Sequence, residues 1–328
     1  MSKHVFLPPT VNISPPHTKL NFSMPRRILS GIMRNKLNVC RYSSQIISEY
    51  LRRFLVERKG VLNSSEIEPV HRMRVASRRL RAALNAFKGM LPAKKTKIWT
   101  REISKIGRVL GQARQLDVQI KFLESAKKRL KNNLSIFHVE VVIKSLKKKR
   151  RQTQKQINIV LEGFEAKKRL PELSAYLGKL SSGKHMCPID QSNLPEGTII
   201  LKRLNKLLVF VPYVSKPQSI KELHRMRIAA KKLRYTLEIY RPYHGSDFDK
   251  YIRASRDIQD LLGDLHEFDC LAGVLADFSK KPCKDFKDTV SYLIQECARK
   301  RQAVYIKFIR LWSNLEKTRM WEKLKREF

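Results

Sequence analysis

The chain of 328 residues carries 69 Lys and Arg residues against 29 Asp and Glu residues, a formal net charge of +40. With 42% hydrophobic residues it can bury a sizeable core, which excludes general disorder, and it lacks any run of 18 apolar residues that could span a membrane. So large a positive charge favours an acidic partner, such as a nucleic acid, an anionic membrane surface or a polymer of phosphate.

The beginning of the chain and its cysteines indicate a cytoplasmic protein. Residues 1–24 are rich in Pro, Asn and Ser and lack a basic stretch followed by an apolar one, so no secretory signal is predicted. We expect residues 1–27 to form a disordered tail. The five cysteines are scattered and form no CxxC pair, which is typical of reduced thiols rather than of a disulfide framework or a zinc site. These cysteines are Cys40, Cys187, Cys270, Cys283 and Cys297.

Helical periodicity dominates from about residue 27 onward, and no alternating strand pattern appears. Gly60 suits the end of the first helix, and Ser65 with Glu68 has capping-box spacing, followed by Pro69 in a first turn. In the first half the predicted helices are 28–59, 69–87, one that ends near Leu110-Gly111, 117–130, 136–164 and 170–180.

The helical pattern then recurs. Residues 181–197, with Gly and Pro, are predicted to be a linker, and helices follow over 201–211 and 220–240. Three later segments repeat earlier ones at offsets of 150 to 152. Leu262-Gly263 matches Leu110-Gly111, His266-Glu-Phe-Asp269 matches Arg114-Gln-Leu-Asp117, and Lys300-Arg301-Gln302 matches Arg150-Arg151-Gln152. The sequence therefore predicts an all-α fold of two pseudo-symmetric helical bundles, 28–180 and 198–328, made by internal duplication.

The clearest repeat is an 11-residue basic motif. It reads His71-Arg-Met-Arg-Val-Ala-Ser-Arg-Arg-Leu-Arg81 in the first half and His224-Arg-Met-Arg-Ile-Ala-Ala-Lys-Lys-Leu-Arg234 in the second. The two histidines are 224 − 71 = 153 residues apart, and every basic position of the first copy is basic in the second. The duplication therefore preserves charge.

Each motif helix has an apolar face and a basic face, at about 100° per residue. The apolar stripes comprise Met73, Ala76, Leu80, Ala83, Leu84 and Phe87, and Met226, Ala229, Leu233, Leu237 and Tyr240. The opposite stripes comprise His71, Arg74, Arg78 and Arg81, and His224, Arg227, Lys231 and Arg234, with Arg79 and Lys232 beside them. Each basic stripe extends over roughly 15 Å.

A basic helix face is most often simply solvated, but such a face usually mixes charges because like charges four residues apart destabilise a helix. From His71 to Lys88 there is no acid, and from His224 to Arg241 there is only Glu238. We therefore favour anion binding, for which Arg offers bidentate phosphate contacts and Lys a point charge.

No catalytic, metal or cofactor site is predicted. His71 and His224 are beside arginines that would repel a metal ion, so each either contacts phosphate or is buried with a structural role. Asp117 and Asp269 supply one carboxylate per half, too few for magnesium, and we expect them to cap a helix or orient an arginine. No Walker loop, GxSxG or HExxH motif and no cluster of acids is present.

These segments resemble the CHAD family, the conserved histidine α-helical domain. Its motifs are similar to His-x-x-Arg-Val-x-x-Arg-Arg-Leu-Arg, then Leu-Gly-x-x-Arg-Asp-x-Asp, then a second copy that ends Leu-Arg-Tyr. Here they are found at His71–Arg81, Leu110–Asp117 and His224–Tyr235, and the resemblance covers residues 28–328. It implies two pseudo-symmetric helical bundles that bind inorganic polyphosphate, often at polyphosphate granules. By resemblance the phosphate contacts are His71, Arg74, Arg78, Arg79, Arg81, His224, Arg227, Lys231, Lys232 and Arg234.

The chain departs from the family at two points. Gln115 stands where the family usually has Asp, and His266 stands at the counterpart of Arg114. Some relatives carry a triphosphate-tunnel domain marked by Glu-x-Glu-x-Lys, whereas this chain has only Glu66-Ile-Glu68-Pro-Val70, so triphosphatase activity is not implied.

We expect a non-enzymatic protein that holds polyphosphate in a shared basic groove or pore. The alternative is sequence-independent nucleic-acid binding through the same charge, helped by the basic run 147–151. Neither a recognised DNA-binding motif nor an aromatic stacking platform accompanies the stripes.

Overall fold

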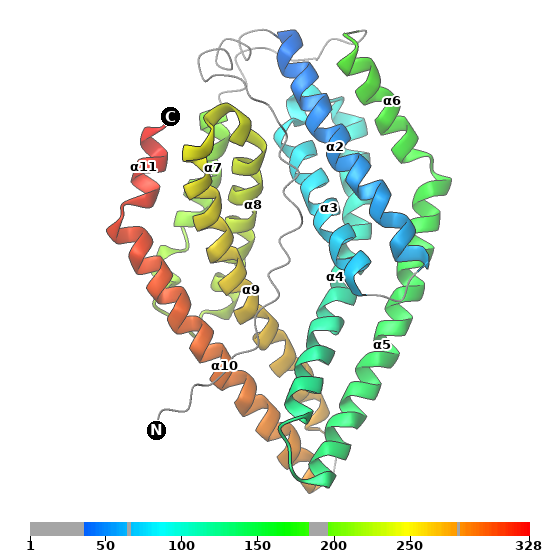
Figure 1. The fold of residues 1–328 in the computed structure, drawn as a ribbon, viewed down its shortest axis with the longest axis vertical. Helices are drawn as coiled ribbons and strands as arrows, with labels where there is room; N and C mark the ends of the chain where they lie inside the picture. The colour runs from blue at the N-terminus through cyan, green and yellow to red at the C-terminus, as the bar shows by residue number, and fades with distance from the viewer. Residues whose placement is uncertain (1–35, 64–66, 184–195, 281–282) are drawn as a thin grey trace.

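The computed structural model describes residues 36–63, 67–183, 196–280 and 283–328. Within these ranges the chain is helical without any strand, as predicted (Figure 1). The expected tail 1–27, Ser65 of the expected capping box and most of the expected linker 181–197 lie outside the described residues.

The first half packs as a sequential helical bundle. Helix α2 packs against α3 and α6, α3 against α4, and α4 against α5 (blue to green in Figure 1). The helices are α2 (Lys36–Asn63), α3 (Ile67–Ala86), α4 (Ala93–Lys127), α5 (Asn133–Ala166) and α6 (Arg169–Ser181).

The second half repeats this order with a shorter first helix. Helix α7 packs against α8, α8 against α9, α9 against α10, and α10 against α11. Its helices are α7 (Glu196–Leu208), α8 (Ile220–His244), α9 (Asp249–Phe278), α10 (Lys284–Lys317) and α11 (Met320–Arg326). The matching order agrees with an internal duplication, which remains a prediction.

Two glycines do not end helices as predicted. Leu110 and Gly111 lie in the middle of the 35-residue α4, where two helices were expected. One glycine inside a helix costs only about 1 kcal/mol, and the buried stripe continues past it through Leu110 and Ala113. Gly60 lies inside α2, where a Cβ atom would be 3.2 Å from Cβ of Pro69. Its small size lets α2 and α3 approach closely.

Local sequence explains several helix ends. Pro69 lies in the first turn of α3, as predicted. The side chain of Asn132 caps α5 by accepting hydrogen bonds from the backbone N–H groups of Leu134 and Ser135. Lys168 and Arg319, which precede α6 and α11, both have a φ of 50°. A residue in the left-handed backbone conformation therefore precedes the last helix of each half.

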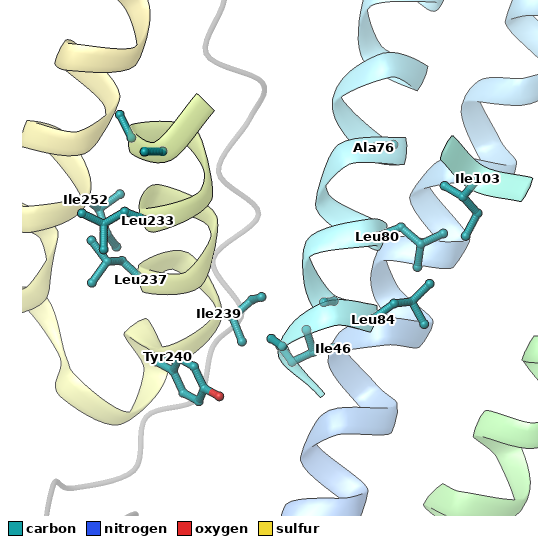
Figure 2. Packing of buried hydrophobic residues seen from close by; sticks show 14 of the residues in the cluster. Ile46, Ala76, Leu80, Leu84, Ile103, Leu233, Leu237, Ile239, Tyr240 and Ile252 are labelled. Atoms are coloured by element: carbon teal, nitrogen blue, oxygen red, sulfur yellow. The ribbon is translucent and has the colours of Figure 1, made fainter. Parts of the chain in front are cut away.

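Two hydrophobic clusters hold the fold together. The larger one contains the buried faces of α3 and α8, including Leu80 and Leu233 (Figure 2). The smaller one joins α4, α5, α9 and α10 where these four helices converge at the lower end of Figure 1, with Leu123 and Val290 among its members. The halves therefore share an apolar contact far from the basic motifs.

The halves also meet at the carboxyl ends of α3 and α8. The hydroxyl of Tyr42 donates a hydrogen bond to the carbonyl oxygen of Ile239 at 2.6 Å. The rings of Phe87 and Tyr240 lie edge to face, 6.4 Å apart. This contact fixes how the two motif helices lie relative to one another.

No helix in the described part of the chain is long and apolar enough to cross a membrane. Cys40 is disulfide-bonded, so the expectation of reduced thiols is wrong for this residue. Cys270, Cys283 and Cys297 are free thiols, and Cys187 lies outside the described residues.

Candidate functional site

The apolar faces of α3 and α8 point away from one another. Figure 2 shows Leu80 and Leu84 directed away from α8, and Leu233 and Leu237 directed away from α3. All four side chains are fully buried. Because the basic stripe lies opposite the apolar stripe on each helix, the two basic stripes are turned toward one another.

The charges of the two stripes affect one another across the interface. Burial, followed by the positive charges of Arg78, Arg227 and Arg74, lowers the pKa of Lys231 to about 7. Burial, followed by Arg78 and Arg114, lowers the pKa of Arg74 to about 9. Effects of this kind require short distances between charges. Both motif helices therefore contribute to one cluster of cations.

These cations form no ion pairs with acids in the described part of the chain. None of Arg74, Arg78, Arg81, Arg227 and Lys231 has a carboxylate within ion-pair distance among the described residues. The Nε atoms of Arg74, Arg78 and Arg81 are buried without a hydrogen-bond partner. Burying unpaired positive charge is costly, so this arrangement suits an anion. We call His71, Arg74, Arg78, Arg81, Arg114, Arg227 and Lys231 the central cationic cluster.

Two predicted site residues lie elsewhere. Nε of Arg79 is 3.4 Å, and Nε of Arg234 is 2.8 Å, from a carboxylate oxygen of Glu238. The three side chains are only 17%, 13% and 14% exposed, in the order Arg79, Arg234 and Glu238. Burial would raise the pKa of Glu238, but Arg234 and Arg79 together lower it. The trio is an ion bridge between α3 and α8.

Lys232, which was predicted to flank the stripe, lies toward α7. Burial, Arg203 and Lys206 lower its pKa, and Arg81 adds to this effect. It therefore stands between the central cationic cluster and a second group of cations on α7.

The two motif histidines are near cations and held neutral. Burial, followed by Arg114, lowers the pKa of His71 to about 4. Burial, followed by Arg227, also lowers the pKa of His224, whose ring lies 4.0 Å from that of His266. Nδ1 of each motif histidine is buried without a partner. An unpartnered Nδ1 of this kind can donate a hydrogen bond to a phosphate oxygen.

Charged residues of α4 and α9, outside the two motif helices, also lie near the basic stripes. Arg114 of α4 lowers the pKa values of both His71 and Arg74, so it belongs with them. On α9, partial burial with Asp260 and Glu267 raises the pKa of Asp264 to about 6. These three acids of α9 therefore lie near one another and near the basic stripes. The spacing of these acids along α9 carries the signal, since Asp260, Asp264 and Glu267 repeat every three or four residues.

Comparison with known proteins identifies the family. The model of the CHAD domain matches residues 45–276. The chain belongs to the CHAD family. Its fold is similar to the crystal structure of the CHAD domain from the plant Ricinus communis, with a TM-score of 0.61 and 21% identity over 82% of this chain and 91% of that one. It is equally similar to PptA from Streptomyces chartreusis, with a TM-score of 0.61 and 14% identity over 83% and 98% of the two chains. No curated protein matches.

The second motif of the CHAD domain orients arginines, as was expected of its aspartates. Asp117 accepts a hydrogen bond from Nε of Arg150 at 2.8 Å, and Asp269 accepts one from Nε of Arg301 at 2.6 Å. Both aspartates lie well inside helices, so the alternative that they cap helix starts is wrong. The equivalent arginines are 301 − 150 = 151 residues apart, one position from the register that we expected.

No group of three or more His, Cys, Asp or Glu side chains suited to a metal ion occurs among the residues that the structure describes. Both motif aspartates of the CHAD domain are engaged by arginine. The arrangement of cations can hold several phosphate groups at once, because Arg and Lys donate to phosphate oxygens without a metal ion.

Proposed function

We propose that the chain binds inorganic polyphosphate in its central cationic cluster, without catalysis. One observation carries the proposal: two basic helix faces from the two halves are turned toward one another, and the cations Arg74, Arg78, Arg81, Arg227 and Lys231 form no ion pair with a carboxylate among the described residues. Membership of a family that is known for polyphosphate binding supports the choice of polymer. A cytoplasmic location at polyphosphate granules is part of the same proposal.

A polymer suits this arrangement better than a single phosphate. Each half offers its own cations, so a chain that is bound by one half is held at high effective concentration near the other. The guanidinium groups of the cluster provide bidentate contacts, and Lys231 provides a point charge. Affinity should therefore grow with polymer length.

A nucleic acid is the second candidate. Exposed cations that form no ion pair within the described ranges follow one face of α5, and such a face could meet a duplex backbone. They are Lys144, Lys148, Arg151 and Lys155. The half-buried central cationic cluster, in contrast, favours a thin and flexible chain.

A titration over a salt series distinguishes these candidates. We expect long polyphosphate to bind more tightly than duplex DNA of equal charge, and much more tightly than triphosphate. On the duplex DNA scale, log K should fall by about 0.9 per neutralised phosphate for each unit of log salt. Equal affinity for triphosphate and long chains, or a preference for DNA, would contradict the proposal. Release of phosphate by the pure protein with magnesium or manganese would contradict its non-catalytic part.

A further inference from the structure

A second basic surface lies beside the central cationic cluster. An open pocket of about 280 Å³ lies between α7, the turn that follows it and α8, and we call it the α7–α8 pocket. Its apolar floor includes Phe210 and Ile228. Its four cations are Arg203 and Lys206 from α7, and Arg225 and Lys232 from α8.

The first half neutralises the position that corresponds to Arg225. Its counterpart in the repeat is Arg72, since 225 − 72 = 153. Nε of Arg72 is 2.8 Å from a carboxylate oxygen of Glu57. Arg225 has no such partner among the described residues. The second half therefore leaves the positive charge of Arg225 without an ion-pair partner in the described residues, whereas Glu57 neutralises the corresponding charge of Arg72 in the first half.

Lys232 differs from its counterpart in the same way. That counterpart is Arg79, since 232 − 79 = 153, and Arg79 is paired with Glu238. The position that corresponds to Glu238 is 238 − 153 = 85, where the neutral Asn85 donates a hydrogen bond to the carbonyl oxygen of Arg81. Lys232 is consequently left without an acid in the described part of the chain.

The α7–α8 pocket is electrostatically continuous with the central cationic cluster. Burial, Arg203, Lys206 and then Arg81 lower the pKa of Lys232. Arg81 belongs to the central cationic cluster, so Lys232 is close to both groups. A polyanion could pass from one group to the other while it stays next to positive charge.

The opposite side of α8 is less favourable to a polyanion. There the positive charge of Arg234 is near Asp260, and that of Arg227 is near Glu267 and Asp264. These carboxylates of α9 repel phosphate groups, whereas the α7 side of α8 lacks acids at the pocket. The charge distribution thus gives an emerging chain one preferred direction.

We propose that the α7–α8 pocket is a second phosphate-binding site for the same polyphosphate chain, which leaves the central cationic cluster past Arg81 and Lys232. The apolar floor supports the aliphatic stems of the pocket's Lys and Arg side chains, so their charged ends remain available. This inference rests on the proposed function and names the path that the polymer takes.

Two variants with equal loss of charge test the path. The pocket variant carries Arg203→Gln, Lys206→Gln, Arg225→Gln and Lys232→Gln. The control variant carries Lys144→Gln, Lys148→Gln, Arg151→Gln and Lys155→Gln on the exposed face of α5. For long polyphosphate we expect the pocket variant to lose about tenfold or more in affinity and the control variant to lose much less. The slope of log K against log salt should also become shallower in the pocket variant, by the equivalent of up to ~4 phosphate contacts. For tripolyphosphate, neither should differ much from the wild type.

Lysine labelling provides an independent readout on the wild-type protein. Saturating long polyphosphate should protect Lys206 and Lys232 from an amine-reactive reagent and leave Lys148 reactive, while tripolyphosphate should protect neither pocket lysine. If the wild type binds long chains but the pocket lysines stay reactive, or if both variants lose affinity equally, the inference is overturned. If the wild type binds polyphosphate of no length, the proposed function itself has failed.

Discussion

Arg78 and Arg79 are neighbours in the sequence but differ in what surrounds them. Arg78 belongs to the central cationic cluster and has no acidic partner among the described residues. Arg79 is held by Glu238, which comes from the other half of the chain. The resemblance assigned both residues to phosphate, and the geometry supports that role for Arg78 alone.

The two arginines should therefore respond differently to the same change. Arg78→Gln should weaken polyphosphate binding and leave stability unchanged or slightly higher, since like-charge repulsion falls by a few tenths of a kcal/mol. Arg79→Gln should lower the free energy of unfolding by about 1–3 kcal/mol, because the buried Glu238 loses the partner that joins it to α3. Urea unfolding and a polyphosphate titration on both variants would measure this. If Arg79→Gln instead weakened polyphosphate binding and left the free energy of unfolding unchanged, Arg79 would belong to the binding site.

Lys231 should make binding depend on pH. Its pKa is lowered from 10.5 to about 7, so the ligand-free side chain loses its proton as pH rises through 7. A bound phosphate favours the charged form, so binding takes up a proton between about pH 7 and 10.5 and weakens as pH rises in that window. Without ligand the unfolded chain holds more protons there, so the stability of the free protein rises with pH.

Calorimetry in two buffers with different ionisation enthalpies would measure this proton uptake at pH 8. Lys231→Arg should reduce the uptake and flatten the pH dependence, because arginine stays charged. Identical uptake by the wild type and the variant would show that Lys231 does not contact the polymer.

At the scale of helices, the periodicity predicted most elements and the faces that they bury. It failed at Gly60 and Gly111, because a single glycine is a weak helix breaker when packing continues on both sides. The ion bridge to Glu238 was beyond sequence reasoning, since it joins positions 159 residues apart. Arg114 could be suspected from its motif, and the acids of α9 from their spacing, but neither could be placed against α3 or α8.

The apolar stripes of the motif helices should be as important as their charges. Leu80 and Leu233 are completely buried in the larger cluster. Leu80→Ala or Leu233→Ala should lower the free energy of unfolding by roughly 2–5 kcal/mol through the cavity that each leaves. Ile159→Ala, at a position that is 67% exposed, should change it by no more than about 0.5 kcal/mol. Denaturant unfolding would check both. Equal effects at buried and exposed positions would contradict this packing.

At the scale of the whole molecule, two apolar contacts, in addition to the ion bridge of Arg79, Arg234 and Glu238, hold the halves together on either side of the central cationic cluster. One is formed by Tyr42, Phe87 and the end of α8, and the other by the rings of Phe122 and Phe268 with the smaller cluster. Repulsion among the cations acts against both contacts. The ligand-free fold is therefore under electrostatic stress where the halves meet.

Salt should consequently act in opposite directions on the free and the bound protein. We expect thermal unfolding without ligand to shift to higher temperature as sodium chloride rises from low ionic strength, since screening relieves the repulsion. The added stability from polyphosphate should shrink over the same series. Scanning calorimetry with and without the polymer would follow both trends. If the ligand-free protein instead lost stability as salt increased, repulsion among these cations would not be what destabilises the fold.

The unpaired cations between the two contacts have a consequence for how quickly the protein is degraded in a cell. If the chain binds polyphosphate as proposed, the bound polymer also bridges the halves. Without it they are held by the apolar contacts, the hydrogen bond of Tyr42 and the ion bridge of Arg79 and Glu238, against the repulsion of the cations. Transient opening then exposes the junction to proteases, whose action tracks the population of open molecules. If the proposed binding holds, the lifetime of the protein should follow the abundance of polyphosphate.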